Sequence, residues 1–195
     1  RINLPSMYSA AKVHPDHCGL IVILSVNPFV GKRLKINFPV SDQFAQSLRF
    51  ISKYSIEFAD GEVSAYSAPT SSCPGLAFSG GADSTAALLL MPLTTVSVFL
   101  DRPQTNSKSL YDKSAPKAAI SEVRELGYEV HEIVCDVEEV RSPIGFPSDM
   151  APAIPLVAIA SQRGIDSIAF GMIMESAYRV GHEVAREYVG SSHWR

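Results

Sequence analysis

The sequence has few cysteines, and none of them is paired. Its three cysteines, Cys18, Cys73 and Cys135, are far apart, and no C-x-x-C pair occurs. This spacing excludes a zinc ribbon built on cysteine pairs and indicates no disulfide framework. Because unpaired, widely spaced cysteines are typical of a reducing compartment, we expect the protein to be cytoplasmic.

Long apolar runs and an excess of one charge are also missing. The longest apolar runs, such as 19–26, are far shorter than the roughly 20 residues that a membrane helix needs, so we expect no membrane partner. The net charge of −3 gives no overall attraction to nucleic acid. A local basic patch stays open, and with it an RNA partner such as a tRNA.

The first part of the chain, residues 1–70, predicts a small β-rich region. The run GLIVILSV predicts a buried strand at 19–26, because it is short, apolar throughout and bounded by proline-containing segments. Asp60 and Gly61 predict the turn of a hairpin over 55–66. The remaining expected elements are a strand at 34–38, a helix at 41–54 whose N-cap is Ser41, and a linker at 67–74.

From residue 75 onward, expected strands and helices alternate. This alternation predicts an α/β domain over 75–195, with a Rossmann-like parallel sheet, flanking helices and right-handed crossovers. In such sheets, ligands bind at the carboxyl ends of the strands. The expected strands are 76–78, 95–100, 128–135 and 167–172, and the expected helices are 83–90, 116–126 and 151–163.

One short motif lies between the first of these strands and its helix. It consists of Ser79, Gly80, Gly81, Ala82, Asp83, Ser84 and Thr85. The two glycines permit a sharp turn and close approach of an anion, and the amides and dipole of the helix start attract negative charge. The three hydroxyls are suited to donate to phosphate oxygens. Asp83 fits beside phosphates if it caps the helix or holds Mg²⁺ through water.

Two other nucleotide-binding motifs are absent. A Walker loop requires G-x-x-x-x-G-K-[ST], whereas Gly31-Lys32 is followed by Arg33 and has no glycine five positions earlier. A G-x-G-x-x-G dinucleotide fingerprint does not occur. The sequence therefore offers one phosphate-binding candidate, at 79–85.

The six residues SGGADS at 79–84 resemble the SGGxDS signature of the PP-loop ATP pyrophosphatase superfamily, also called adenine nucleotide alpha-hydrolase-like. The resemblance extends over about 75–188. It implies an enzyme that binds ATP and Mg²⁺ and cleaves ATP to AMP and pyrophosphate. Cleavage would adenylate an acceptor for amide formation or for nitrogen or sulfur transfer. Asp83 would hold the metal, and Ser79, Asp83 and Arg179 would take part in catalysis.

The same resemblance extends the nucleotide site to the ends of other strands. The nucleotide-binding residues would be Ser79, Gly80, Gly81, Asp83, Ser84, Thr85, Phe99, Leu100, Asp101, Gly171 and Glu175. The backbone at Phe99 and Leu100 would meet the adenine edge. For Glu175 the alternatives are a magnesium ligand and a helix-initiating acid; for Arg179 they are a pyrophosphate contact and a solvated surface cation.

Several alternatives stay open at this point. A non-catalytic ATP- or AMP-binding module would keep ATP intact, and an adenylyl-sulfate reductase-like protein would need a redox-active cysteine at the site. The loop 141–147 is expected near the acceptor pocket, whereas a metal site at 14–18 is disfavoured because its ligands are too close in sequence. The family's fifth strand has no counterpart after the expected helix at 180–188, so the domain is expected to be incomplete. A homo-oligomer or a partner subunit is not excluded.

Overall fold

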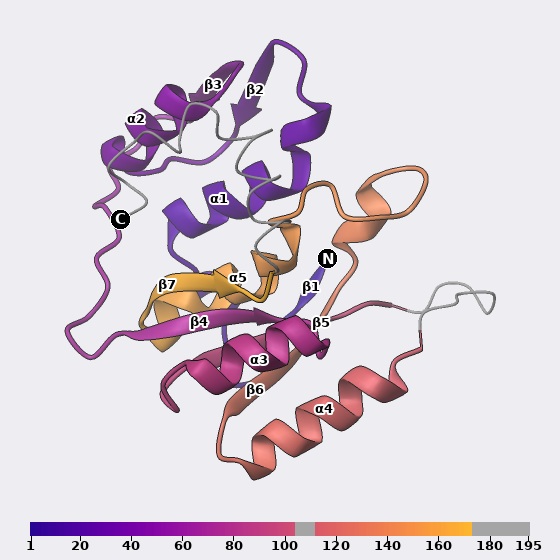
Figure 1. Ribbon diagram of the computed structural model, residues 1–195. Coiled ribbons are helices and arrows are strands. Elements are labelled where there is room, and N and C mark those ends of the chain that lie inside the picture. Colours follow the sequence, from indigo (N-terminus) through magenta and orange to yellow (C-terminus); the bar gives the residue numbers. More distant parts are fainter. Residues whose placement is uncertain (104–111, 173–195) are drawn as a thin grey trace.

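A computed structural model describes residues 1–103 and 112–172. A mostly parallel five-stranded sheet, in the order β1-β6-β5-β4-β7, is flanked by helices (Figure 1). This arrangement is consistent with a Rossmann-like fold, and the four strands expected from residue 75 onward are confirmed. The strands are β1 (Ile2–Asn3), β4 (Cys73–Phe78), β5 (Val96–Asp101), β6 (Glu129–Cys135) and β7 (Ile165–Phe170).

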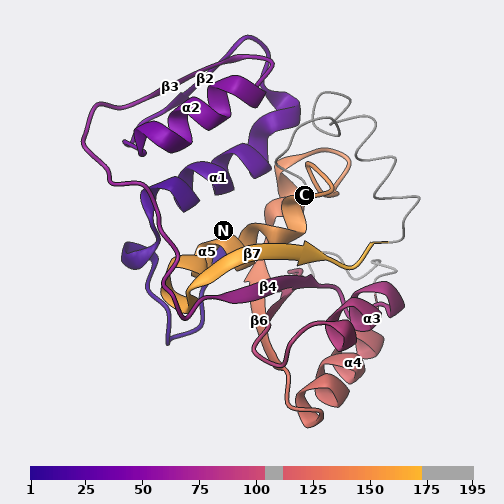
Figure 2. The same cartoon turned by 60° about the vertical axis from the view of Figure 1, so that its left-hand side comes forward.

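Helices cover both faces of this sheet (Figure 2). On one face lie α3 (Ala82–Leu90) and α4 (Ser114–Glu125), and on the other lies α5 (Ile154–Arg163). Successive side chains of a strand point to opposite faces, so Phe99 packs in the core under α3 and α4 while Val98 packs against α5. The three expected helices are therefore confirmed. Helices α3 and α4 are buried on one side, whereas α5 is buried on all sides over residues 154–160, because it lies between the sheet and α1.

The chain order along the sheet reverses at β4. From β4 the chain proceeds outward to β5 and β6, and it then returns to place β7 on the other side of β4. Strand β4 is parallel to both of its neighbours. In open parallel sheets, ligands bind outside the carboxyl ends of the strands where the order reverses. The carboxyl end of β4 is therefore the position at which this topology favours a binding site.

The strand predicted at 19–26 is wrong, because this run belongs to helix α1 (Pro15–Val26). His14 caps the helix by accepting a hydrogen bond from the amide of Asp16. The run is apolar all round because α1 lies between two layers. Ile21 packs toward the core beside α5, whereas Val22 packs into a separate cluster formed with two further strands. A short apolar run of this kind does not reveal its period.

The predicted hairpin over 55–66 is also wrong. Strand β3 (Ser55–Phe58) pairs in parallel with β2 (Arg33–Ile36), and the crossover between them is helix α2 (Asp42–Ile51). A parallel pair requires such a crossover, which leaves no role for a tight turn at Asp60 and Gly61. With helices of 12 and 10 residues against strands of four, the first 70 residues are not β-rich. The N-cap predicted at Ser41 is confirmed, because its hydroxyl accepts from the amide of Phe44 at 3.2 Å.

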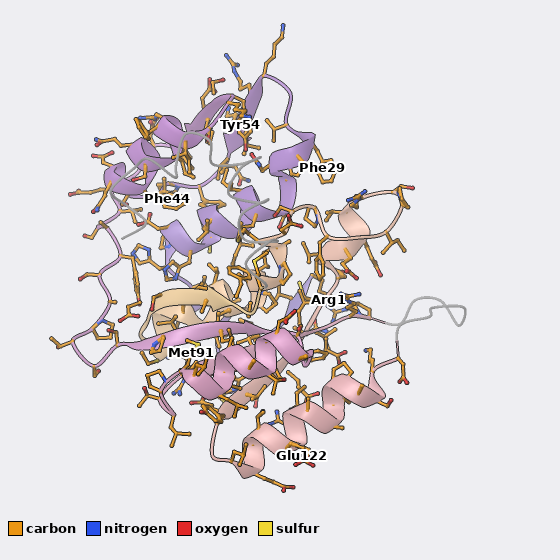
Figure 3. The ribbon with its side chains drawn as sticks, viewed as in Figure 1. Arg1, Phe29, Phe44, Tyr54, Met91 and Glu122 are labelled. Atoms are coloured by element: carbon orange, nitrogen blue, oxygen red, sulfur yellow. The ribbon has the colours of Figure 1, made fainter. Side chains whose placement is uncertain are left out.

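The first 70 residues contact the central sheet in two ways. Strand β1 pairs with β6 in antiparallel orientation, and α1 packs on α5. Beyond α1 lie α2 and then the pair β2–β3, so the layers are stacked outward from the central sheet (Figure 2). Phe44 of α2, labelled in Figure 3, lies against α1 so closely that a Cβ at Gly19 would be 2.7 Å from its ring.

A buried carboxylate connects these outer layers. Asp16 of α1 is 6% exposed and accepts hydrogen bonds from the amide and the hydroxyl of Ser41, both at 2.7 Å, and from the amide of Tyr66 at 3.3 Å. One side chain thus holds the start of α2 and the extended segment that leads back to β4. A charged group is stable in this position because its oxygens are hydrogen-bonded.

An imidazole next to this carboxylate is held neutral. The ring of His17 lies 4.4 Å from that of Tyr66, between centroids. Burial lowers the pKa of His17 to about 4, with a further lowering from His14. Among the residues that the structure describes, no hydrogen-bond partner reaches its Nδ1. Protonation of His17 is therefore unfavourable in the folded protein.

We expect Asp16→Ala to lower the free energy of unfolding by about 3 kcal/mol, because it leaves three buried donors without their acceptor. Urea unfolding followed by circular dichroism measures this loss. Asp42→Ala is the control, since Asp42 is exposed at the start of α2. Equal stability of Asp16→Ala and Asp42→Ala would contradict the role assigned to the carboxylate.

We expect His17→Phe to reduce the loss of stability on acidification. In the unfolded chain His17 binds a proton near pH 6.5, whereas in the folded protein it does so near pH 4. Stability associated with this group is therefore complete above pH 6.5 and decreases as the pH falls toward 4. Thermal unfolding at several values of pH in this window should show a shallower dependence for the variant. Parallel curves for the two proteins would refute this account.

Candidate functional site

The motif at 79–85 forms a tight turn between β4 and α3, at the carboxyl end of the sheet (Figure 1). Gly80 has a φ of 73°, which side chains rarely tolerate, so glycine is needed here. Gly81 is the N-cap of α3 and provides no side-chain hydrogen bond to the helix start. The first-turn amides have no acceptor within the helix, and in the part of the chain that the structure describes no side chain caps them, although Gly171 lies against the amide of Ser84.

Ser84 holds the turn together from inside. Ser84 is only 1% exposed. Its Oγ accepts a hydrogen bond from the amide of Ser79 at 3.2 Å and donates one to the carbonyl of Gly81 at 3.1 Å. The hydroxyls of Ser79 and Ser84 are 2.9 Å apart. Ser84 is thus a structural residue of the turn in this conformation, and a contact from its hydroxyl to phosphate stays a prediction.

Asp83 lies in the first turn of α3 and is exposed. The alternative in which it caps the helix is wrong, because the cap position belongs to Gly81. Its carboxylate is therefore available to solvent and to a cation. A negative charge in the first turn also interacts favourably with the helix dipole. Thr85, which follows Ser84, is half-buried, and its amide donates a hydrogen bond to the carbonyl of Gly81 at 3.0 Å.

Two backbone segments approach the turn too closely for side chains. A Cβ at Gly171, directly after β7, would lie 2.2 Å from the Cα of Ser84. A Cβ at Gly80 would lie 2.6 Å from the Cα of Pro116, in the first turn of α4. Gly171 was expected at the site from the sequence, and the structure brings it against Asp83 and Ser84. A Cβ at Gly81 would meet only the hydroxyl of Ser79, at 3.4 Å, so this side of the turn is open.

A small cavity of about 70 Å³ lies next to the turn, at the carboxyl ends of β4 and β5. It is bounded by both strands, by the start of the segment leading to α5, and by one aromatic residue from the loop 141–147. Its lining residues are Ala77, Phe78, Ser79, Phe99, Leu100, Arg102, Phe146 and Pro152. Phe99 and Leu100 are 2% and 6% exposed, so their side chains are core residues and their backbone is what faces the strand end.

Charged side chains surround the end of β5. The ammonium of Lys113 is 2.5 Å from a carboxylate oxygen of Asp101 and 2.5 Å from the carbonyl oxygen of Arg102. The guanidinium of Arg102 lies 4.9 Å from the ring centroid of Phe146, and its Nε is 3.4 Å from Glu138. These contacts fix the strand end, and Arg102 and Phe146 also line the cavity.

Sequence reasoning missed two of these residues. Lys113 holds Asp101 from the start of α4, and Phe146 lines the cavity from a loop whose individual side chains had no distinguishing pattern. The general position of 141–147 near the site is as expected. Glu175 and Arg179, both assigned to the site from the sequence, lie outside the described residues.

Metal ligands are few in the described part of the chain. Within residues 1–103 and 112–172, no three His, Cys, Asp or Glu side chains come together to hold a metal ion. In nucleotide sites Mg²⁺ is usually held by one or two carboxylates and by phosphate oxygens of the substrate. A single carboxylate, that of Asp83, therefore fits a magnesium ion that phosphate oxygens also bind.

Comparisons with protein-family models, with curated proteins and with solved structures found no match. In the ranges that the structure describes, no helix has the length and apolar character needed to cross a membrane. The chemical argument for the site therefore depends on the geometry of the turn, the adjacent cavity and the sequence motif.

We expect Gly171→Ala to destabilise the protein by about 1–3 kcal/mol, because the new methyl group would overlap backbone atoms of α3 that have no room to move. Thermal and urea unfolding measure the change. Gly31→Ala is the matched control, since nothing lies within 4 Å of a Cβ at Gly31. If both variants unfold at the same denaturant concentration, the close approach of β7 to α3 is incorrect.

Proposed function

We propose that this protein binds Mg-ATP at the turn 79–85 and cleaves it to AMP and pyrophosphate while adenylating an acceptor. The observation that carries the proposal is the turn itself. It follows the central strand at which the chain order reverses, it has a positive φ at Gly80, and it opens into a helix whose first amides have no capping side chain. Anions bind at such helix starts.

The phosphates would be held by groups that the turn already presents. Bare amides of the first turn of α3 suit the pyrophosphate portion, and the open side of Gly81 leaves room for its oxygens. The hydroxyl of Ser79 lies at the rim, between the turn and the cavity. Asp83 would hold Mg²⁺, which when bound neutralises charge on the departing pyrophosphate.

The cavity between β4 and β5 is the candidate adenine site. Its walls are mainly apolar, and the backbone of Phe99 and Leu100 offers polar groups at one edge. At about 70 Å³ it is smaller than the pockets of roughly 300 Å³ or more that hold nucleotide-sized ligands. Binding would therefore require Phe146 to move away from Arg102, and the loop 141–147 would act as an adjustable cover.

The proposed reaction needs no nucleophile from the protein. An oxygen of the acceptor attacks the α-phosphorus, and the bond from that phosphorus to the bridging oxygen breaks, so that pyrophosphate leaves with the electron pair. A nitrogen or sulfur donor then attacks the adenylated acceptor, and the bond between the acceptor and the phosphate oxygen breaks to release AMP. Residues of the turn would orient the phosphates and stabilise the developing charge. Amides, one hydroxyl and one carboxylate suit this role. The resemblance of SGGADS to the PP-loop signature supports the same chemistry.

The alternative of an adenylyl-sulfate reductase-like protein has little support among the described residues. Cys135, at the carboxyl end of β6, is 1% exposed, and burial raises the pKa of its thiol. Cys73 lies at the start of β4, the opposite end of the strand from the turn. A buried, protonated thiol is a poor redox nucleophile. The non-catalytic ATP-binding module is distinguished from the enzyme only by product analysis.

The direct test is to incubate the protein with Mg²⁺ and ATP labelled at the α-phosphate, with and without candidate acceptors that carry a carboxylate, carbonyl or amide oxygen. We expect pyrophosphate together with an equal amount of label in the adenylated acceptor, and conversion of that label to free AMP when ammonia is added as a nitrogen donor. Binding of ATP without cleavage would favour the non-catalytic module. Formation of ADP, or no binding of ATP at all, would contradict the proposal.

We expect Asp83→Ala to reduce magnesium-dependent formation of AMP at least about a hundredfold, because the metal and the leaving group lose their carboxylate. The fold should remain, since Asp83 is exposed. Asp42→Ala is the matched control, because Asp42 also lies exposed in the first turn of a helix. Unchanged turnover in Asp83→Ala would exclude Asp83 as the metal ligand.

A further inference from the structure

Positive charge is concentrated in one part of this acidic protein. The 32 residues from 27 to 58 contain five Lys or Arg and two acids, although the whole chain has a net charge of −3. The remaining residues therefore carry a net charge of −6. This part of the chain forms the outermost layer of the molecule, which consists of β2, α2 and β3 (Figure 2).

Two of these basic residues, Arg33 and Lys35, lie on the outer face of β2, whereas Arg49 belongs to α2. Arg33 and Lys35 are exposed and pair across the two strands with Ser55 and Glu57, which are exposed as well. The alternate residues of both strands, such as Ile36, pack inward in the cluster shared with α1 and α2. The outer face of this small sheet is therefore entirely polar.

Two further lysines lie at one end of this face. Lys32 precedes β2 and Lys53 precedes β3 by two residues, and both are exposed. Because the strands are parallel, their starts are adjacent, and the amide of Ser55 donates to the carbonyl of Lys32 at 3.1 Å. The single acid of the face, Glu57, is 3.2 Å from the Nε of Arg33. The lysines add positive charge beyond that pair.

We propose that this outer face, defined by Lys32, Arg33, Lys35 and Lys53, binds a strand of nucleic acid. Positive charge on an otherwise acidic protein attracts a polyanion. Residues two apart on a strand are separated by about 6.6 Å and point to the same face. Arg33 and Lys35 are therefore both placed to contact phosphates of one nucleic-acid strand.

The composition of the face favours nucleic acid over a lipid surface. Binding in a membrane interface requires apolar side chains that enter the bilayer beside the cations, and the outer positions of β2 and β3 provide none. Phe29, 53% exposed and three residues before Lys32, lies at the edge of this layer (Figure 3). An exposed ring beside cations is suited to stack on an unpaired base.

This proposal goes beyond nucleotide cleavage and does not depend on it. The outer face is separated from the central sheet by α2 and α1 (Figure 2), and the turn at 79–85 contributes nothing to it. Binding is therefore measured without ATP, and variants of the outer face are expected to retain the cleavage activity of the parent protein.

The test uses the full chain and a fluorescein-labelled single-stranded RNA of about 20 nucleotides, followed by fluorescence anisotropy between about 50 and 200 mM salt. We expect Lys35→Gln/Lys53→Gln to bind about tenfold more weakly at low salt. Its plot of log affinity against log salt should be less steep by about 1.4, since each lost phosphate contact removes about 0.7. Lys12→Gln/Lys117→Gln removes the same charge elsewhere and should bind like the parent.

Several results would overturn the proposal. The parent protein would show no binding below about 100 μM RNA at low salt, or the two double variants would lose affinity equally, which would indicate net charge alone. Tighter binding to phosphatidylserine vesicles than to RNA, abolished by Lys35→Gln/Lys53→Gln, would assign the face to a membrane instead. Circular dichroism of both variants confirms that the fold is retained.

Discussion

The close contact of backbones around the turn that follows β4 is the constraint on which the site depends. The segment after β7 and the first turn of α4 both reach this turn at distances that no Cβ would permit. Because three elements meet at one strand end, the start of α3 is held in place without a capping side chain. Among the described residues no side chain bonds the first amides of α3, and the side of the turn at Gly81 is open, which is the feature that suits an anion.

The residues of this turn have two different roles, one structural and one directed toward solvent. Ser84, buried and bonded on both sides, uses its hydroxyl to hold the turn closed, whereas Asp83 and the open side of Gly81 face solvent. The proposed chemistry requires this separation, because a group that orients phosphates must itself be fixed. The cavity beside Ser79 extends the site to the end of β5, where Asp101 is held by Lys113.

The outer layer is attached by different means. Asp16 gathers three donors from α2 and from the segment leading back to β4, and α1 supplies apolar side chains to the layers on both of its sides. Since one helix serves two cores, the outer layer is bound firmly to the sheet, yet the outer face of β2 and β3 remains free of apolar contacts and carries the cations.

The parallel sheet, its helices and the turn at 79–85 were predictable from the sequence, because alternating strand and helix periods, glycine ends and the Ser41 cap are local signals. The segments 19–26 and 55–66 were predicted wrongly, since an apolar run buried on all sides has no visible period and parallel pairing depends on a distant crossover. The family resemblance placed Gly171 at the site, but its contact with α3, and the positions of Phe146 and Lys113 at the neighbouring strand end, are known from the folded structure alone. These contacts arise from packing between residues far apart in the chain, which no local pattern records.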